Sequence, residues 1–278
     1  MIRIGAQVSV AGGMQQTLEE AEQMGLDCLQ IFSRSPVGGQ SRGLPQSKQM
    51  AQWLAGAQIR PLFVHAPYFV NPAATDEVMH AKACQVLGDE MRRVRHLAGD
   101  FLVVHPGHQQ TGASSIEALD AFADTVISLL TARGRVLIEN TAGQGKEVGS
   151  SFEDLARVFN AVGKTSRVGL MLDTAHAMAW GYPLTTANDW KLLCSLIDEN
   201  IGLARVRGVH LNDSLFPIGS RRDQHAALLT GYFGSKALQD IVATADEYNW
   251  PLILETPGKN AAARAADLAI LRNIIAGL

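Results

Sequence analysis

Side chains that can bind metal ions stand at the ends of six apolar runs in this sequence. These residues are His65, His105, Glu139, Asp173, His210 and Glu255. Ionisable groups that are buried without a compensating charge each cost several kcal/mol. Divalent metal ions held between these side chains would remove that cost. The pattern therefore predicts a metal cluster at one place in the fold.

Three further candidate ligands lie in loops. His176 follows Asp173 by three residues, and Asp223 and His225 have the i, i+2 spacing that can chelate one ion from an extended loop. The candidate ligands are then five histidines, two aspartates and two glutamates, enough for three ions if one carboxylate bridges two of them. Mixed nitrogen and oxygen ligation without cysteine suits Zn²⁺, and also Mn²⁺ or Fe²⁺.

These side chains must be positioned by strands, because strand-like and helix-like patterns alternate along the whole chain. The expected strands are Arg3–Val8, Cys28–Phe32, Leu62–His65, Phe101–His105, Val136–Glu139, Val168–Asp173, Val206–Leu211 and Leu252–Glu255. The expected helices are Met14–Met24, Thr75–Leu97, Ser115–Ala132, Ser151–Asn160, Asp189–Ile201, Lys236–Tyr248 and Ala261–Ala276. Apolar strands that alternate with helices indicate a parallel sheet covered by helices.

Eight such units in 278 residues predict an α/β fold of the TIM type, a closed (β/α)8 barrel that forms a single domain over residues 1–278. The six strand-end residues would then share the C-terminal mouth of the barrel, where active sites of this fold lie. An open dinucleotide-binding sheet is disfavoured, because Ala11-Gly12-Gly13 after the first strand is too short for the glycine-rich fingerprint.

The composition of the chain argues for or against several other classes of protein. Apolar residues make up 47% and charged residues 18%, and we expect neither a membrane span nor a signal peptide. Three scattered cysteines, Cys28, Cys84 and Cys194, favour a reducing cytoplasm. The net charge of −3 argues against a nucleic-acid partner, but three divalent ions would change it to +3 and concentrate the positive charge in one place.

A set of motifs spread along the chain is similar to one known family. The motifs are Gly5-Ala6-Gln7-Val8-Ser9, His65-Ala66-Pro67-Tyr68, His105-Pro106-Gly107, Ile138-Glu139-Asn140-Thr141-Ala142-Gly143-Gln144-Gly145, Leu172-Asp173-Thr174-Ala175-His176, His210-Leu211-Asn212-Asp213, Gly219-Ser220-Arg221-Arg222-Asp223-Gln224-His225 and Leu254-Glu255-Thr256-Pro257. With these motifs the sequence resembles endonuclease IV, the zinc-dependent apurinic/apyrimidinic (AP) endonuclease family. All nine positions where that family places zinc ligands carry the expected residue type.

The resemblance implies three Zn²⁺ sites in one monomeric chain. They would be formed by His65, His105 and Glu139; by Glu139, Asp173, His210 and Glu255; and by His176, Asp223 and His225, with Glu139 as the bridge. Zinc lowers the pKa of a bound water to about 7, which makes a hydrolytic nucleophile available near neutral pH. Glu139 and Glu255 would be the catalytic residues that position this nucleophile.

The resemblance also implies the substrate and the residues that contact it. The partner would be double-stranded DNA that contains AP sites, cut to leave a 3′-hydroxyl and a 5′-deoxyribose phosphate. Tyr68, Phe69, Ser220 and Arg221 are the expected DNA contacts. The chain departs from the family at Gln7, where histidine is usual, and in the loops Arg34–Gly43 and Leu228–Gly234. The metal ligands are therefore kept while the loops that read DNA differ.

Two other functions fit parts of this pattern. Glu139, Asp173, His210 and Glu255 would also satisfy a sugar isomerase or epimerase of the xylose isomerase type. Such an enzyme has no need for the five additional ligands His65, His105, His176, Asp223 and His225. The altered loops leave a second alternative, a metal-bound relative that binds DNA but cleaves it weakly.

Overall fold

Eight parallel strands close into a barrel in the computed structural model, which describes residues 2–38, 47–131, 134–257 and 261–278. The strands follow the order β1-β10-β7-β6-β5-β4-β3-β2, and β2 pairs with β1 to complete the ring. They are β1 (Ile4–Gln7), β2 (Cys28–Phe32), β3 (Leu62–His65), β4 (Phe101–Val104), β5 (Val136–Glu139), β6 (Val168–Asp173), β7 (Val206–His210) and β10 (Leu252–Leu254). The predicted TIM-type barrel is confirmed, because each of its eight strands falls within one expected run.

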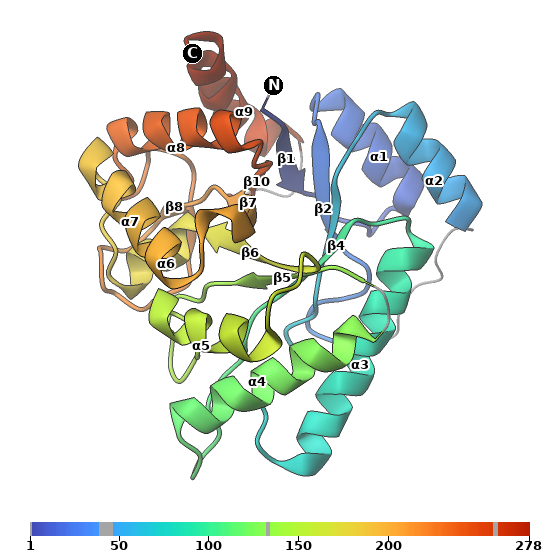
Figure 1. Cartoon of the computed structure of the whole chain (residues 1–278). Helices are drawn as coiled ribbons and strands as arrows, with labels where there is room; N and C mark the ends of the chain where they lie inside the picture. The colour runs from blue at the N-terminus through green and yellow to red at the C-terminus, as the bar shows by residue number, and fades with distance from the viewer. Residues whose placement is uncertain (1, 39–46, 132–133, 258–260) are drawn as a thin grey trace.

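Helices surround this barrel on its outer side (Figure 1). They are α1 (Met14–Gln23), α2 (Ser47–Gly56), α3 (Glu77–His96), α4 (Ser115–Leu130), α5 (Phe152–Val162), α6 (Thr174–Trp180), α7 (Ala187–Asn200), α8 (Ser235–Tyr248) and α9 (Ala261–Ala276). From α1 to α9 they follow one another clockwise in Figure 1. Since strand–helix–strand crossovers are right-handed, the N-terminal ends of the strands face the reader and the C-terminal mouth faces away. Among the described helices, none is long and apolar enough to cross a membrane.

Two helices and one strand pair were not expected from the sequence. α2 buries Met50 and Leu54, which have the i, i+4 spacing of one helix face. α6 has only seven residues, and it begins directly after Asp173, whose side chain accepts a hydrogen bond from the His176 amide. The short strands β8 (Asp213–Ser214) and β9 (His225–Ala226) pair antiparallel above the barrel. α6 and the β8–β9 pair both carry candidate ligands, so they belong to the site.

The barrel interior is filled by a layer of apolar side chains. Its members are Cys28, Phe63, Val103, Leu137, Met171 and Ile253, which form a cluster apart from the core between the barrel and the helices. Gly5 and Gly208 complete the layer without side chains: a Cβ atom at Gly5 would lie 2.5 Å from the Cys28 carbonyl oxygen and 2.7 Å from Ile253, and one at Gly208 would lie 3.1 Å from Met171. Cys28 is fully buried in this layer, and burial raises the pKa of its thiol.

A second layer lies two residues further along each strand. Side chains alternate between the two faces of a strand, so residues at i and i+2 point the same way. Stepping on from the apolar layer therefore brings one inward side chain per strand to the C-terminal mouth. These eight residues, the mouth ring, are Gln7, Gln30, His65, His105, Glu139, Asp173, His210 and Glu255. Strand alternation alone thus gathers all six strand-end candidates.

Candidate metal centre

The first group of candidate ligands joins β3, the end of β4 and β5. The Nε2 atoms of His65 and His105 lie 3.2 Å and 3.1 Å from Oε2 of Glu139. One ligand atom from each residue lies within 4.8 Å of the others. His65 and Glu139 are buried, and His105 is half-buried. This group can hold one metal ion.

The second group shares Glu139 with the first. His210 Nδ1 lies 3.0 Å from Oε1 of Glu139 and 3.3 Å from Oε2 of Glu255. Asp173 completes the group, with its Oδ2 atom 3.8 Å from the same nitrogen. Glu139 therefore turns Oε2 to the first group and Oε1 to the second. That is the geometry a bridging carboxylate requires.

The third group lies on α6, on the loop before β9 and on the first residue of β9. Nε2 of His176 and Nε2 of His225 lie 3.1 Å and 3.5 Å from Oδ1 of Asp223. Asp173 is also near, because its Oδ2 lies 3.8 Å from His225 Nε2, and ligand atoms of Asp173, His176 and His225 lie within 4.8 Å of one another. The structure thus brings the expected trio together and places Asp173, a member of the second group, beside it.

Two nitrogen atoms in this third group indicate that a cation fits it. Nε2 of His176 and Nε2 of His225 are buried, and among the described residues neither makes a well-aligned hydrogen bond, although both face the Asp223 carboxylate. A buried polar atom without a hydrogen bond costs free energy, and a metal ion between these nitrogens and Asp223 would supply the missing contact. The donor set of imidazole and carboxylate groups suits Zn²⁺, Mn²⁺ or Fe²⁺.

Hydrogen bonds on the far side of the imidazole rings select which nitrogen is free for a metal. Nδ1 of His65 and Nδ1 of His176 lie 2.8 Å and 2.9 Å from the carbonyl oxygens of Ala66 and Asn140. A carbonyl only accepts, so these nitrogens carry the proton and Nε2 keeps its lone pair for a metal. His210 has the opposite arrangement, because its Nε2 atom lies 2.7 Å from Oε1 of Gln30 and its Nδ1 atom faces the second group.

Two amide side chains that the sequence had not marked hold the second group in place. Gln30 donates from Nε2 to Oε1 of Glu255 at 2.6 Å and accepts the His210 proton on Oε1. Asn212 donates from Nδ2 to Oδ2 of Asp173 at 2.7 Å, and its Oδ1 atom accepts from the Glu255 amide at 2.9 Å. Attention to ionisable residues missed both. The available signal for Gln30 was a lone polar side chain within an apolar strand.

The carboxylates control the charge of the ligand histidines. Burial alone would lower the pKa of His210, but Glu139 and Glu255 beside it raise that pKa to about 9. Burial alone would raise the pKa of Asp223, but His176 and His225 hold it below its ordinary value. Without ions, the carboxylates beside His210 therefore favour its protonated form. Metal ions would take the place of the imidazolium protons.

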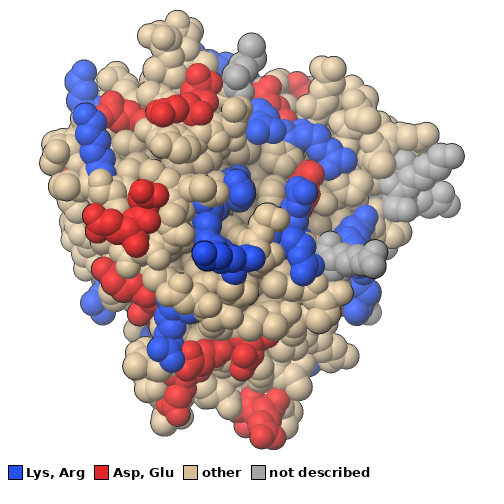
Figure 2. Space-filling model, viewed as in Figure 1, with Lys and Arg blue, Asp and Glu red and all other residues tan. Residues whose placement is uncertain are grey.

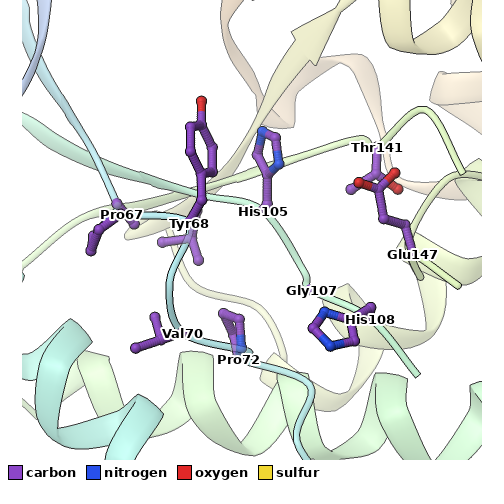
Figure 3. Close-up of a pocket in the computed structure, with 11 residues that line it drawn as sticks. Pro67, Tyr68, Val70, Pro72, His105, Gly107, His108, Thr141 and Glu147 are labelled. Carbon is purple, nitrogen blue, oxygen red and sulfur yellow. The ribbon is translucent and has the colours of Figure 1, made fainter. Parts of the chain in front are cut away.

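Tyr68 and Phe69 stand at the rim of the mouth, where DNA contacts were expected. Their exposed fractions are 53% and 43%. The Tyr68 ring lies 5.3 Å from the His65 ring and 5.5 Å from the His105 ring, measured between centroids. Beside these rings is a small cavity of about 130 Å³, into which His108 and Glu147 also face (Figure 3). A substrate that contacts Tyr68 would therefore also reach the first ligand group.

The other two expected DNA contacts lie on the loop before Asp223. The Arg221 guanidinium lies over the Trp180 ring at 4.5 Å, and the neighbouring Arg222 lies over Phe216 at 4.6 Å. The Ser220 hydroxyl oxygen is buried without a hydrogen-bond partner in the described part of the chain. Stacking fixes the plane of each guanidinium while leaving its N–H edge free to bind a phosphate.

The loop that follows β2 departs from the expected family pattern in a specific way. Arg34 turns inward and pairs with Asp89 and Glu90 of α3, and its side chain is only 15% exposed. Ser33 donates to the same Glu90 carboxylate, which is fully buried. Arg34 therefore ties the loop after β2 to α3 and does not face the mouth. Residues 39–46, which include Arg42 and Gly43, lie outside the described residues.

The remaining departures lie on both sides of the mouth. Gln7 belongs to the mouth ring, and its Oε1 atom is buried without a hydrogen-bond partner among the residues described. Within the segment Leu228–Gly234, the amides of Gly231 and Phe233 donate to the Asp213 carboxylate, both at 2.9 Å. Asp213 itself begins β8. This segment is therefore tied to the strand pair that carries His225.

Comparison with known proteins places the chain in a family. Residues 18–274 match the family described as xylose isomerase-like TIM barrel. The chain is 34% identical to a probable endonuclease 4 of Moorella thermoacetica over 280 residues, covering 98% of this chain and 99% of the relative. It is 36% identical to a probable endonuclease 4 of Halorhodospira halophila over 269 residues, covering 92% of this chain and 89% of the relative.

Solved structures separate a close match from matches in fold only. The crystal structure of endonuclease IV from Thermus thermophilus superposes with a TM-score of 0.85 at 31% identity, covering 99% of this chain and all of that one. A D-tagatose 3-epimerase-like protein superposes with a TM-score of 0.76 at 18% identity, which shows the shared barrel alone. By its sequence along nearly its full length and by its barrel, this chain belongs to the endonuclease IV family.

Proposed function

We propose that this chain is a DNA-repair phosphodiesterase that cuts the backbone on the 5′ side of AP sites. The products would be a 3′-hydroxyl and a 5′-deoxyribose phosphate, and the cofactor would be three Zn²⁺ ions per chain, with Mn²⁺ or Fe²⁺ as substitutes. One observation carries this proposal: Glu139 turns one carboxylate oxygen to His65 and His105 and the other to His210. A bridged pair of sites with a third group beside it suits the hydrolysis of a phosphodiester.

The ligand assignment follows from the three groups described above. We propose His65, His105 and Glu139 for one ion; Glu139, Asp173, His210 and Glu255 for the second; and His176, Asp223 and His225 for the third. Bound divalent ions would supply a water that ionises near neutral pH and positive charge to neutralise the phosphate.

The side chains around the ions have their own tasks. Glu139 and Glu255 would orient the attacking water, and Gln30 keeps Glu255 in place through a 2.6 Å hydrogen bond to Oε1. Asn212 restrains Asp173 in the same way. Fixed ligands matter because a displaced nucleophile reacts more slowly, even when the displacement is about 1 Å. The amide hydrogen bonds therefore favour a preorganised site.

The rim would hold the damaged DNA. Tyr68, beside the first ligand group, and its neighbour Phe69 are exposed aromatic side chains, suited to enter the space that a missing base leaves. Ser220 and Arg221 would contact phosphates from the opposite side. Unstacking costs a few kcal/mol per step and is smallest where a base is already lost, which favours AP sites over intact DNA. We further propose that residues 1–278 act as one domain and as a monomer in the cytoplasm, consistent with the free cysteines Cys28, Cys84 and Cys194.

A sugar isomerase or epimerase is the second candidate, because Glu139, Asp173, His210 and Glu255 form a compact single-ion group. The five other candidate ligands lie within the same mouth, and an enzyme with a single ion does not need them to bind metal. The third candidate, a relative that binds DNA but cleaves it weakly, draws support from Arg34, which faces α3 and not the mouth.

Cleavage of a duplex with a single AP site tests the proposal directly. The purified chain, loaded with Zn²⁺, should cut the damaged strand once and leave a 3′ end that a DNA polymerase extends. Glu139→Gln should lower the rate by about a thousandfold or more, since it removes the charge shared by two ions. Glu153→Gln, at an exposed position on α5, is the matched control and should cleave normally.

Metal quantification on the same samples separates the candidates. About three ions per chain with AP-site cleavage supports the nuclease. Three ions with duplex binding and no cleavage would favour the weakened relative. A single ion per chain, with no cleavage and with epimerisation of a ketose, would favour the carbohydrate enzyme.

A further inference from the structure

The barrel has a second opening at its N-terminal face, and this opening is basic. A cavity of about 350 Å³ lies there, lined by four arginines, Arg3, Arg60, Arg135 and Arg207. Asp100 is the one carboxylate in this lining, so the formal charge of the wall is +3. Figure 2 shows this face, and Lys and Arg side chains gather around its centre. A chain of net charge −3 thus concentrates positive charge at one end.

The strands bring these arginines to the opening. Arg3 and Arg135 precede the apolar-layer residues Gly5 and Leu137 by two positions, so strand alternation points them into the barrel. Arg207 reaches the cavity in another way. The pairing of β6 with β7 shifts register, with Leu170 opposite Val206 and Met171 opposite Gly208, so that Arg207 is the extra residue. Bulges of this kind redirect a side chain.

Most of this positive charge is not neutralised by the protein. Arg60 pairs with Asp100 at 2.9 Å. Arg3 donates to the Asn249 carbonyl oxygen at 3.4 Å, and Arg135 lies over the Phe101 ring at 5.8 Å. Within the described ranges, Arg3, Arg135 and Arg207 form no ion pair with a carboxylate. An anion in the cavity would relieve the repulsion among these groups.

We propose that this N-terminal cavity is a binding site for a phosphate group. A guanidinium presents a planar fork of N–H donors that fits two phosphate oxygens at once, and several arginines around one cavity can each use that fork. The Tyr248 ring, 44% exposed and stacked on Trp250 at 5.1 Å, adds an aromatic wall on which a base could stack. The phosphate would therefore come from a nucleotide or from a DNA strand. The site lies at the opposite end of the barrel from the metal centre and is independent of the proposed cleavage.

Titration of the Zn²⁺-loaded full chain with three probes tests this site. The probes are inorganic phosphate, thymidine 5′-monophosphate and a short undamaged duplex. Backbone amide NMR and calorimetry measure the binding of each probe. We expect saturable shifts at residues 60, 100–101, 206–207 and 248–250. The double variant Arg135→Gln, Arg207→Gln should weaken this binding by about tenfold or more, because charged hydrogen bonds are lost. The double variant Lys82→Gln, Lys191→Gln removes the same charge from exposed positions on α3 and α7 and should change it less than about twofold.

The pattern of probes identifies the source of the phosphate. Shifts with the mononucleotide but not with the duplex identify a free nucleotide, and shifts with the duplex identify backbone phosphates. Signals around His225 report any binding at the metal centre and serve as the internal reference. The proposal fails if no probe shifts the amide signals of the residues around the N-terminal cavity, or if both double variants weaken binding equally. Melting curves confirm that each variant folds. Arg207→Lys keeps the positive charge but loses the planar fork of N–H donors, so its affinity for the probe should lie between those of the wild type and the double variant.

Discussion

The two ends of this barrel carry different kinds of ionisable group on one framework. The C-terminal mouth collects carboxylates and imidazoles, including Glu139, Asp173 and Glu255, whereas the N-terminal opening collects Arg3, Arg60, Arg135 and Arg207. The apolar layer that includes Phe63, Leu137 and Met171 separates them. Because that layer is neutral and fully buried, each end can specialise without disturbing the other. The net charge of the whole chain, −3, therefore does not predict the local charge at either end of the barrel.

The two ends also differ in how their charges are restrained. At the mouth, Gln30 and Asn212 hold the acidic ligands by hydrogen bonds of 2.6 Å and 2.7 Å. At the N-terminal opening, the arginines are half-buried or exposed, and among those described only Arg60 has a carboxylate partner. A fixed cluster suits ions that must be placed accurately for a reaction. A looser basic wall suits an anion that binds and leaves.

Removal of the metal ions should have the largest effect and should act at one end only. Chelation would leave the carboxylates of the mouth without their cations, so cleavage should stop and the melting temperature should fall by about 10 °C. This magnitude corresponds to about 4 kcal/mol for ligands present at about 1,000 times their Kd, and to about 2–4 °C per kcal/mol for a domain of this size. Calorimetry with and without Zn²⁺ measures it. On chelation, the melting temperature of the double variant Arg135→Gln, Arg207→Gln should fall by the same amount. A much smaller fall would mean that the two ends of the barrel are coupled.

Gln30→Ala should have the next largest effect. It removes the acceptor that fixes the His210 tautomer and the donor that holds Glu255, so we expect the affinity for Zn²⁺ to fall by about 10–100-fold. Competition with a fluorescent chelator measures the affinity, and NMR of the imidazole nitrogens reports the tautomer. Gln7→Ala is the matched control from the adjacent strand, where the carbonyl oxygen has no partner in the described part of the chain, and should change the affinity less than about threefold. Equal losses would show that general packing at the ring matters more than the hydrogen bonds.

Tyr68→Ala should have a smaller effect, confined to the rim. The exposed ring can fill the gap at an AP site but gains little on intact DNA, so binding to the AP duplex should weaken by about tenfold and binding to undamaged duplex by less. Fluorescence anisotropy with both duplexes measures the difference. Tyr68→Phe keeps the ring and should restore the preference. Equal weakening on both duplexes would assign Tyr68 to packing against His65 and His105.

Much of the fold was predictable because a short apolar run is a local property of the sequence. Near-continuous apolar runs, separated by helical segments, sufficed to place all eight barrel strands. The same local rule marked the ends of six strands as one site. α2 and α6 were missed for local reasons too, since one follows a segment of sequence rich in glycine and the other has only seven residues.

By itself, then, the sequence determined the barrel, the residues at the strand ends and the resemblance to endonuclease IV. The tertiary structure alone decided which side chains support them. Gln30 meets His210 across 180 residues and Glu255 across 225 residues of sequence, a contact that no local pattern contains. Arg34 was open to a role at the mouth until its pairing with α3 was known. The register shift that frees Arg207 is likewise a property of two paired strands and not of either one. Positions along a strand are set by local geometry, whereas partners are set by how distant strands close into a ring.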